Sequence, residues 1–372
     1  MIKYLGSKRL LVPTIVGTIA ALPEVRTVLD LFSGTARVGH ALKARGFRVL
    51  ANDHNDYACM LARCYVQADL EDVIADAEKL IAELQLLPGS AGWFTEVYCE
   101  RARYFQPKNG ARIEAIRERI AQQRLEPERE SVVLVSLLEA ADRVDSTTGV
   151  QMAYLKGWAP RSCNDLTLRL PVLLPRAAFG KGSSFCLEAL EAARSLEADV
   201  AYIDPPYNQH SYLGNYHVWE TLVRWDAPSV YGVAQKRTDC RERKSAFNSK
   251  AKYHDAFSEL IGAMRTKILV VSGNDEGFLP REAVQAILST RGEVACIEHD
   301  YPRYVGARIG IYDPKGKKVG TISHLRNKEL VYVVGPPELL DRAGLAERSS
   351  LRNIAAGTSP SASTKSQHTK GP

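Results

Sequence analysis

The sequence predicts an α/β protein built on a Rossmann-like, doubly wound parallel sheet with helices on both faces, into which a mainly helical segment is inserted. Two neighbouring apolar runs indicate the sheet: residues 27–33 (TVLDLFS) and residues 47–51 (FRVLA) have the length and composition of buried strands. Between them, Gly34 breaks the first run, and apolar residues then recur at helical spacing up to Gly46. This order of strand, glycine turn, helix and strand is typical of the first half of such a sheet.

Three further apolar runs predict additional strands. They are residues 201–203 (AYI), 266–272 (TKILVVS) and 330–335 (LVYVVG). Ligands of doubly wound sheets bind outside the carboxyl ends of the strands. The residues that fall at such ends are Asp30, Gly34, Asp53 and Asp204.

A change of pattern predicts the domain organisation. Between about residues 70 and 196 the sequence consists of long polar and charged helices. We therefore expect residues 1–69 and 197–340 to form the sheet domain and residues 70–196 to form an insertion with a small core of its own. Residues 347–372 are rich in Ser, Thr, Gly and Lys, which predicts a disordered tail.

The composition is that of a globular protein in a reducing compartment. Of the 372 residues, 45% are hydrophobic and 25% charged, and no apolar run approaches the roughly 20 residues that cross a bilayer. The seven cysteines form no CxxC pair, which argues against a zinc site and a disulfide framework; Cys59 and Cys64 are predicted helix residues. We expect a cytoplasmic protein with no metal or membrane partner. The net charge of +6 permits a polyanionic partner.

The most specific signal is the tetrapeptide DPPY, residues 204–207, directly after an apolar run. Neither Pro205 nor Pro206 can donate to a sheet, so the strand must end there, and both prolines restrict the backbone. The carboxylate of Asp204 and the ring of Tyr207 are therefore held at fixed relative positions. A plain strand-terminating turn is the alternative, but the rarity of these residues in this combination favours a functional site.

A second signal is the turn at Gly34, where backbone can pass close to a ligand in front of a helix N-terminus. The turn does not contain GxGxxG. Asp53, about twenty residues downstream at the end of the second strand, stands where an acid accepts hydrogen bonds from a ribose. Together they indicate a nucleoside-type cofactor, with a helix N-cap near His54 as the alternative for Asp53.

The motifs KYLGSKRLLVP, DLFSGTARVG and IDPPY, in this order and with a long segment before the last, resemble the alpha-class, Dam-type DNA adenine methyltransferases, which use S-adenosylmethionine. The segments FNSKAKYHDAF, VVSGNDEGF and YPRYVGARIGIYDPKG are also similar to its bacterial and phage members, so the resemblance covers most of residues 1–335. It implies a class I methyltransferase sheet, an inserted target-recognition domain at residues 70–196, and methyl transfer to the N6 amine of adenine in duplex DNA. A cognate restriction endonuclease is a further partner that such enzymes have.

The resemblance also implies roles for individual residues. Glu188 stands in a cofactor-binding region where relatives more often have aspartate, and Ala36 stands where many have a second glycine. The residues implied to bind the cofactor are Tyr4, Gly6, Ser7 and Lys8 in the N-terminal segment, Asp30, Phe32, Ser33 and Gly34 at its methionine end, Asp53 at its ribose, and Glu188; those implied to act on the target base are Asp204, Pro205, Pro206 and Tyr207.

The chemistry of the target agrees with this assignment. The exocyclic amine of adenine is a poor nucleophile because its lone pair is delocalised into the ring, and Asp204 with the Pro205 carbonyl supplies two acceptors for its protons. The base must also leave the duplex, and stacking on Tyr207 offsets part of that cost. Transfer from a sulfonium donor needs positioning and electrostatics but no metal.

Other functions remain as alternatives. A cytosine C5 enzyme needs a cysteine that normally follows proline, and none of the seven cysteines does. An N4-cytosine enzyme uses the same amine chemistry and is the main alternative, although such enzymes more often have serine at the position of Asp204. A nicotinamide dehydrogenase or a non-catalytic nucleotide-binding module is disfavoured by the single-glycine turn and DPPY.

Residues after DPPY predict contact with the nucleic acid. His210 and His217 follow the motif closely and are candidates for the base pocket or for DNA contact. Residues 235–254 are strongly basic and include two aromatic residues, Phe247 and Tyr253. A run of charge is usually a solvated face, but beside a flipped-base site we expect it to contact phosphates.

Overall fold

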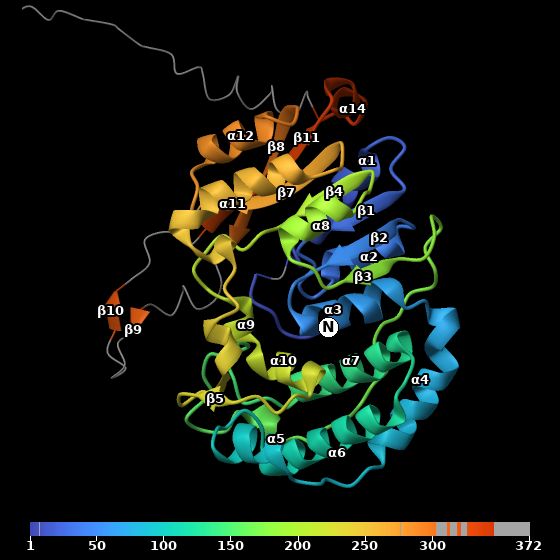
Figure 1. The fold of residues 1–372 in the computed structure, drawn as a ribbon, viewed down its shortest axis with the longest axis vertical. Coiled ribbons are helices and arrows are strands. Elements are labelled where there is room, and N and C mark those ends of the chain that lie inside the picture. The colour runs from blue at the N-terminus through green and yellow to red at the C-terminus, as the bar shows by residue number, and fades with distance from the viewer. Residues whose placement is uncertain (7, 276, 303–310, 313–317, 321–325, 346–372) are drawn as a thin grey trace, which may run out of the picture.

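The computed structural model describes residues 1–345 except 7, 276, 303–310, 313–317 and 321–325, and the side chains of residues 300–327 are not described either. Ser7 and the predicted disordered tail, residues 347–372, therefore lie outside the described residues. Figure 1 shows two lobes, one built on a sheet and one mainly helical, with the N-terminus between them.

The described strands of the first lobe form one seven-stranded sheet, as the sequence predicts. Its order is β3 (Ser183–Phe185), β2 (Arg48–Asn52), β1 (Thr27–Asp30), β4 (Val200–Ile203), β7 (Ile268–Asn274), β11 (Arg326–Gly335) and β8 (Glu293–Pro302). Strand β11 is antiparallel to both of its neighbours, and the other pairs are parallel. The order reverses between β1 and β4, so a crevice opens at their carboxyl ends.

Helices cover both faces of this sheet because alternate side chains of each strand point to opposite faces. Val28 of β1 belongs to one hydrophobic cluster and Leu29, its neighbour, to the other. The first cluster is completed by α1 (Val12–Ala21), α2 (Arg37–Ala44) and α14 (Pro337–Arg342), and the second by α8 (Ala189–Ser195), α11 (Lys250–Ala263) and α12 (Arg281–Ser289). The predicted doubly wound α/β fold is confirmed.

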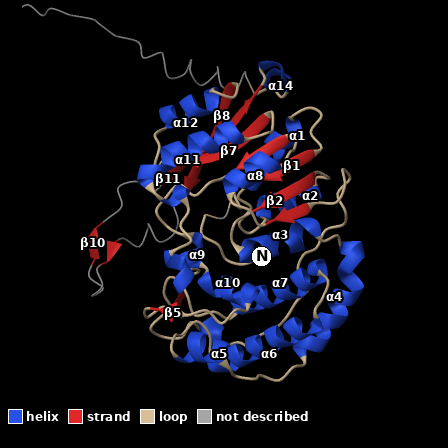
Figure 2. Cartoon of the chain, viewed as in Figure 1, coloured by secondary structure: helices blue, strands red, loops and turns tan. Residues whose placement is uncertain are grey.

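The second lobe is mainly helical and comes from two parts of the chain (Figure 2). The first part supplies α4 (Leu70–Gln85), α5 (Trp93–Thr95), α6 (Pro107–Gln123) and α7 (Pro127–Arg143). The second part follows DPPY and supplies α9 (Tyr212–Asn215), α10 (His217–Arg224) and the hairpin of β5 (Val230–Tyr231) and β6 (Lys236–Arg237). Buried Arg117 of α6 joins them, because it donates to the carbonyl oxygens of Leu222 and Val223 at 2.7 and 3.0 Å.

The lobes differ from the predicted insertion at residues 70–196 in two places, near its C-terminal boundary and after DPPY. Strand β3 pairs with β2, and α8 packs on the sheet, so both belong to the sheet lobe. The strand gives little signal because its sequence is SSF, which lacks an apolar run. Conversely, α10 lies within the predicted sheet domain but packs against α7 and α3 (Asp56–Ala62).

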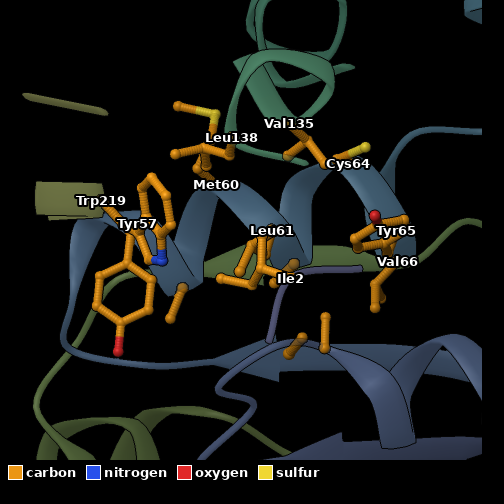
Figure 3. Packing of buried hydrophobic residues seen from close by; sticks show 14 of the residues in the cluster. Ile2, Tyr57, Met60, Leu61, Cys64, Tyr65, Val66, Val135, Leu138 and Trp219 are labelled. Atoms are coloured by element: carbon orange, nitrogen blue, oxygen red, sulfur yellow. The ribbon is translucent and has the colours of Figure 1, made fainter. Parts of the chain in front are cut away.

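The expectation of a separate core for the insertion is wrong. Helix α3 and the π-helical turn after it, η1 (Arg63–Gln67), lie between the lobes, and one cluster of buried residues runs from the sheet through α3 into α7. Figure 3 shows Val135 and Leu138 of α7 on one side of this helix and Ile2 on the other. The two lobes therefore share one hydrophobic core, which restricts movement of one against the other.

The structure corrects one expectation about the cysteines. Cys59 lies in α3, as predicted, but it forms a disulfide with Cys186, which follows β3, and their Cα atoms are 5.6 Å apart. The two residues are 127 positions apart in sequence, so only the packing of α3 against β3 brings them together. Within the described part of the chain, no helix is both long and apolar enough to span a membrane.

Candidate active site

A pocket with about 640 Å³ of empty space, including its open mouth, lies where β1, β2 and β4 end. The site combines three acids, because parallel strands bring Asp30, Asp53 and Asp204 to the same edge of the sheet. The lining residues are Tyr4, Gly6, Lys8, Asp30, Phe32, Ser33, Gly34, Thr35, Arg37, Val38, Asp53, His54, Asn55, Tyr202, Asp204, Pro206 and Tyr212.

The backbone of the turn after β1 favours glycine at position 34. Gly34 has φ +51°, and a Cβ atom there would lie 3.4 Å from the Tyr4 ring. Ala36 also has a left-handed backbone, with φ 58°, although it is not glycine. Since this conformation costs a residue with a Cβ about 1–2 kcal/mol, it gives a physical reason for the second glycine of many relatives.

Asp53 ties this turn to the end of β2. Its Oδ2 accepts a hydrogen bond from the Gly34 amide at 3.0 Å, and its Oδ1 accepts from the backbone and side-chain nitrogens of Asn55 at 3.0 and 3.1 Å. The N-cap residue of α3 is Asn55, so Asp53 is not the cap itself. A carboxylate has about four acceptor positions, which leaves Asp53 one for a ligand.

Asp30 is a buried acid with one satisfied oxygen. Its Oδ2 accepts from the Gly39 amide at 3.1 Å, whereas its Oδ1 has no hydrogen-bond partner among the described residues. Burial, together with the charges of Asp204 and Asp53, raises the pKa of Asp30 to about 7, against the opposing effect of the Gly39 amide. This oxygen could therefore bind a cationic group of a ligand, because no described protein group occupies it.

The N-terminal segment closes one side of the pocket through aromatic stacking. The Tyr4 ring stacks on Tyr212 and Tyr216, with centroid distances of 5.2 and 4.6 Å. Its hydroxyl lies 3.1 Å from that of Tyr57, in α3. Gly6 has φ +72°, and a Cβ there would lie 2.9 Å from the Tyr212 hydroxyl. Glycine at position 6 is therefore needed for close packing.

Asp204 is paired with a cation from the same segment. The Lys8 ammonium lies 3.2 Å from Oδ1 of Asp204 and 3.4 Å from Oε2 of Glu329, and it is also 5.4 Å from the centre of the Tyr207 ring. Lys8 and Glu329 are each 8% exposed, and the Asp204 side chain is 18% exposed. Burial raises the pKa of Asp204, and Lys8 opposes this rise.

A smaller pocket lies behind Tyr207. It has about 350 Å³ of empty space and is walled by aromatic side chains and by the loop after β7. Tyr253 and Phe257 reach it from α11. Its other lining residues are Val271, Ser272, Gly273, Asn274, Gly277, Phe278, Leu279 and Val284.

The structure brings most of the predicted site residues together. Glu188 is exposed just before α8 and is not among the residues that line the first pocket. Pro205 is buried, and Tyr207 faces the second pocket, while Ser7 is outside the described residues. The predicted residues that line the first pocket are Tyr4, Gly6, Lys8, Asp30, Phe32, Ser33, Gly34, Asp53, Asp204 and Pro206.

Residues that sequence reasoning missed also line this pocket. Five of them directly adjoin the predicted motifs, so their closeness to a motif in the sequence could have identified them: Thr35, Arg37, Val38, His54 and Asn55. Tyr202 and Tyr212 flank DPPY, but the contacts of Tyr212 with the N-terminal segment depend on tertiary structure.

The two candidate histidines have different environments. His217 is fully buried at the start of α10, and its Nε2 lies 3.0 Å from the carbonyl oxygen of Gln151. Burial lowers the pKa of His217 to about 3. It is a neutral core residue of the helical lobe, which argues against DNA contact, whereas His210 is exposed.

The basic run 235–254 is partly structural. Arg237 is 1% exposed and pairs with Asp226 and Asp239, at 2.7 and 3.0 Å. Arg243 pairs with buried Glu220 at 2.6 Å. The lysines of the run that are exposed are Lys244, Lys250 and Lys252.

Comparison with known proteins gives one family. The family model described as D12 class N6 adenine-specific DNA methyltransferase matches residues 4–276, which include both pockets except for four of their lining residues. Modification methylase StsI of Streptococcus sanguinis is 29% identical over 326 residues, and Type II methyltransferase M.FokI of Planomicrobium okeanokoites is 30% identical over 309. These matches cover 82% and 78% of this chain but 49% and 47% of the relatives, so the chain spans about half their length.

A third relative matches over most of both chains. Type II methyltransferase M.NlaIII of Neisseria lactamica is 28% identical over 308 residues, which are 80% of this chain and 90% of the relative. The similarity therefore extends across both lobes.

Proposed function

The chain belongs to the D12 class of N6 adenine-specific DNA methyltransferases, and from this premise we propose that it methylates the N6 amine of adenine within a specific sequence of duplex DNA. The observation that carries this proposal is the position of the Asp204 carboxylate, which lines the same pocket as the Gly34 turn. Its relatives are named modification methylases and Type II methyltransferases, which favours a role beside a restriction endonuclease.

The family implies S-adenosylmethionine as the methyl donor, and the pocket residues fit that molecule. The donor carries an ammonium group, and Oδ1 of Asp30 is a buried acceptor without a partner among the described residues. The Ser33 hydroxyl is likewise buried and unpartnered there. Asp30, Ser33 and the Gly34 turn would hold the methionine end, and the remaining acceptor position of Asp53 would receive the ribose.

Asp204 and the Pro205 carbonyl prepare the target amine. When bound, S-adenosylmethionine supplies an activated methyl group on a sulfonium centre. The chain's own task is to make adenine N6 nucleophilic, which it does by accepting hydrogen bonds from both amine protons so that the nitrogen can pyramidalise. Lys8 favours the ionised, acceptor form of Asp204 despite its burial.

The target base must leave the duplex to reach Asp204, at a cost of a few kcal/mol. Tyr207 offers an aromatic face next to this acid, and aromatic stacking contributes about 1–3 kcal/mol per base. Tyr207 also lines the second pocket, together with Tyr253 and Phe278. We assign the helical lobe to target recognition, and the exposed lysines after DPPY to phosphate contact.

The alternative is transfer to cytosine N4, which uses the same amine chemistry. Sequencing of DNA from cells that express the chain, with detection of modified bases, tests both. We expect N6-methyladenine at one short sequence, absent from cells that express Asp204→Ala. N4-methylcytosine at that sequence would replace the adenine assignment, and unmodified DNA would reject the proposal.

A further inference from the structure

Glu329 is a buried acid that the assignments above do not use. It lies in β11, between β7 and β8, and is paired in register with Asn274 and His299. Its side chain is 10% exposed, and its carboxylate lies 3.4 Å from the Lys8 ammonium. Burying a carboxylate away from water is costly unless it is paired, so this acid needs the cation.

Lys8 is therefore shared between two carboxylates. Its ammonium lies 3.2 Å from Asp204 and 3.4 Å from Glu329, and these are its ion pairs among the described residues. Oδ1 of Asp204 has no hydrogen bond of good geometry from the described residues, although Lys8 is this close. The ammonium thus lies between the two carboxylates, slightly nearer to Asp204 than to Glu329.

The sharing of Lys8 between two carboxylates matters because Asp204 must accept hydrogen bonds from the amine of the target adenine. A lysine stem is flexible, and an ammonium that faced Asp204 alone would donate to it directly. Such a contact would occupy acceptor positions that the adenine amine needs. An absent cation would be equally harmful, since a buried carboxylate without a partner becomes protonated.

We propose that Glu329 is a positioning residue for methyl transfer: it anchors the Lys8 ammonium beside Asp204 and prevents the ammonium from closing over both oxygens of that carboxylate. The inference rests on the proposed function, because it concerns the same acceptor site. It predicts that removal of the Glu329 charge and removal of the Lys8 charge change the site in opposite directions.

Other titratable groups surround Lys8, Asp204 and Glu329, and the test must take them into account. Tyr202, Tyr212 and Tyr253 face Asp204 and have pKa values raised by burial, so they stay neutral. Asp30 faces Asp204 from β1, Asp275 faces Glu329 from the end of β7, and His299 of β8 stands opposite Glu329 in the strand register. Saturation with the donor holds Asp30 in one state, and each variant leaves the other two groups unchanged.

The experiment measures kcat against pH for the purified chain with saturating S-adenosylmethionine and duplex DNA. For Glu329→Gln we expect kcat to fall at least about tenfold, with donor affinity within about threefold of wild type, and the acid limb of the profile to move to lower pH. For Lys8→Met we expect the acid limb to move to higher pH. Glu298→Gln is the matched control, because this β8 acid pairs with Arg281 and Lys328 and not with Lys8.

The outcomes separate the two proposals. No transfer by wild type, with the donor bound, rejects the proposed function. An active wild type whose kcat and acid limb are unchanged in Glu329→Gln rejects the positioning role. Calorimetric binding of the donor to each variant verifies its fold, and a loss of kcat with an unmoved acid limb identifies Glu329 as merely structural.

Discussion

The backbone amide of Gly34 donates to Oδ2 of Asp53 across 3.0 Å, so the turn after β1 and the acid after β2 form one unit. The glycine lines the pocket, and the acid fixes the position of its amide. Two motifs 19 residues apart in sequence therefore act as one structural element.

Asp53→Ala should weaken both the donor and the fold. The variant loses the proposed ribose acceptor together with hydrogen bonds to Gly34 and Asn55, at about 1 kcal/mol each. We expect donor affinity to fall at least about tenfold and stability to fall by about 1–3 kcal/mol. Calorimetry and denaturant unfolding measure the two effects; lower stability with unchanged affinity would leave Asp53 with a structural role only.

Asp204→Ala should abolish transfer while donor binding stays within a few-fold of wild type. The reason is that Asp204 is assigned to the target amine and not to the donor. A labelled-methyl transfer assay beside donor titration checks this. Asp204→Asn serves as the control, because it keeps the side-chain volume and removes the charge; substantial activity in the alanine variant would refute the mechanism.

Asp30 should make folding stability depend on pH. Its folded pKa of about 7 lies above the unfolded value of 3.8, so the folded state binds more protons between these values and stability falls as pH rises through this window. At pH 8 the ionised acid costs on the order of 4 kcal/mol. We expect Asp30→Asn to unfold at higher denaturant concentration than wild type at pH 8 but not near pH 4.

The same acid should make donor binding depend on pH. Binding of the cationic donor favours the ionised form of Asp30, so wild-type affinity should rise as pH increases through about 7. The affinity of Asp30→Asn should be lower and should lack this rise. A wild-type affinity that is flat between pH 6 and 8 would remove Asp30 from the donor site.

Gly34→Ala should impair donor binding. The new methyl group would meet the Tyr4 ring, and the left-handed backbone adds about 1–2 kcal/mol of strain. Gly17→Ala is the matched control, because Gly17 lies within α1 and a Cβ there meets no atom within 4 Å. The control should be stabilised by about 0.5–1 kcal/mol; equal donor affinity in both variants would contradict our account of the turn.

The basic run should divide into two functional groups. Replacement of Lys250 and Lys252 by alanine should weaken DNA binding and reduce the slope of log affinity against log salt by about 0.9 for each phosphate that a lysine no longer neutralises. Arg237→Ala should instead destabilise the fold, since it leaves Asp226 and Asp239 without their buried partner. If the slope of log affinity against log salt stays unchanged after both lysine replacements, DNA must contact a different surface of the protein.

The sequence predicts those parts of the site that follow from local pattern. Asp30, Asp53 and Asp204 could be located because strand ends are visible as breaks in apolar runs, and the parallel sheet then brings them together. Strand β3 was missed because SSF has no apolar signal.

Glu329 could not be found in this way. It directly precedes the apolar run 330–335, and its role depends on contact with Lys8, which is 321 positions away. The stacking of Tyr4 on Tyr212 and Tyr216 has the same origin in tertiary structure.

The identity of the methylated base tests the central claim most directly. The purified chain is incubated with unmodified duplex DNA and S-adenosylmethionine that carries a deuterated methyl group, and the DNA is digested to nucleosides for mass spectrometry. We predict that the label appears in N6-methyldeoxyadenosine and is absent when Asp204→Ala replaces the wild type. Label in N4-methyldeoxycytidine, or labelled adenosine from the Asp204→Ala variant, would contradict the account.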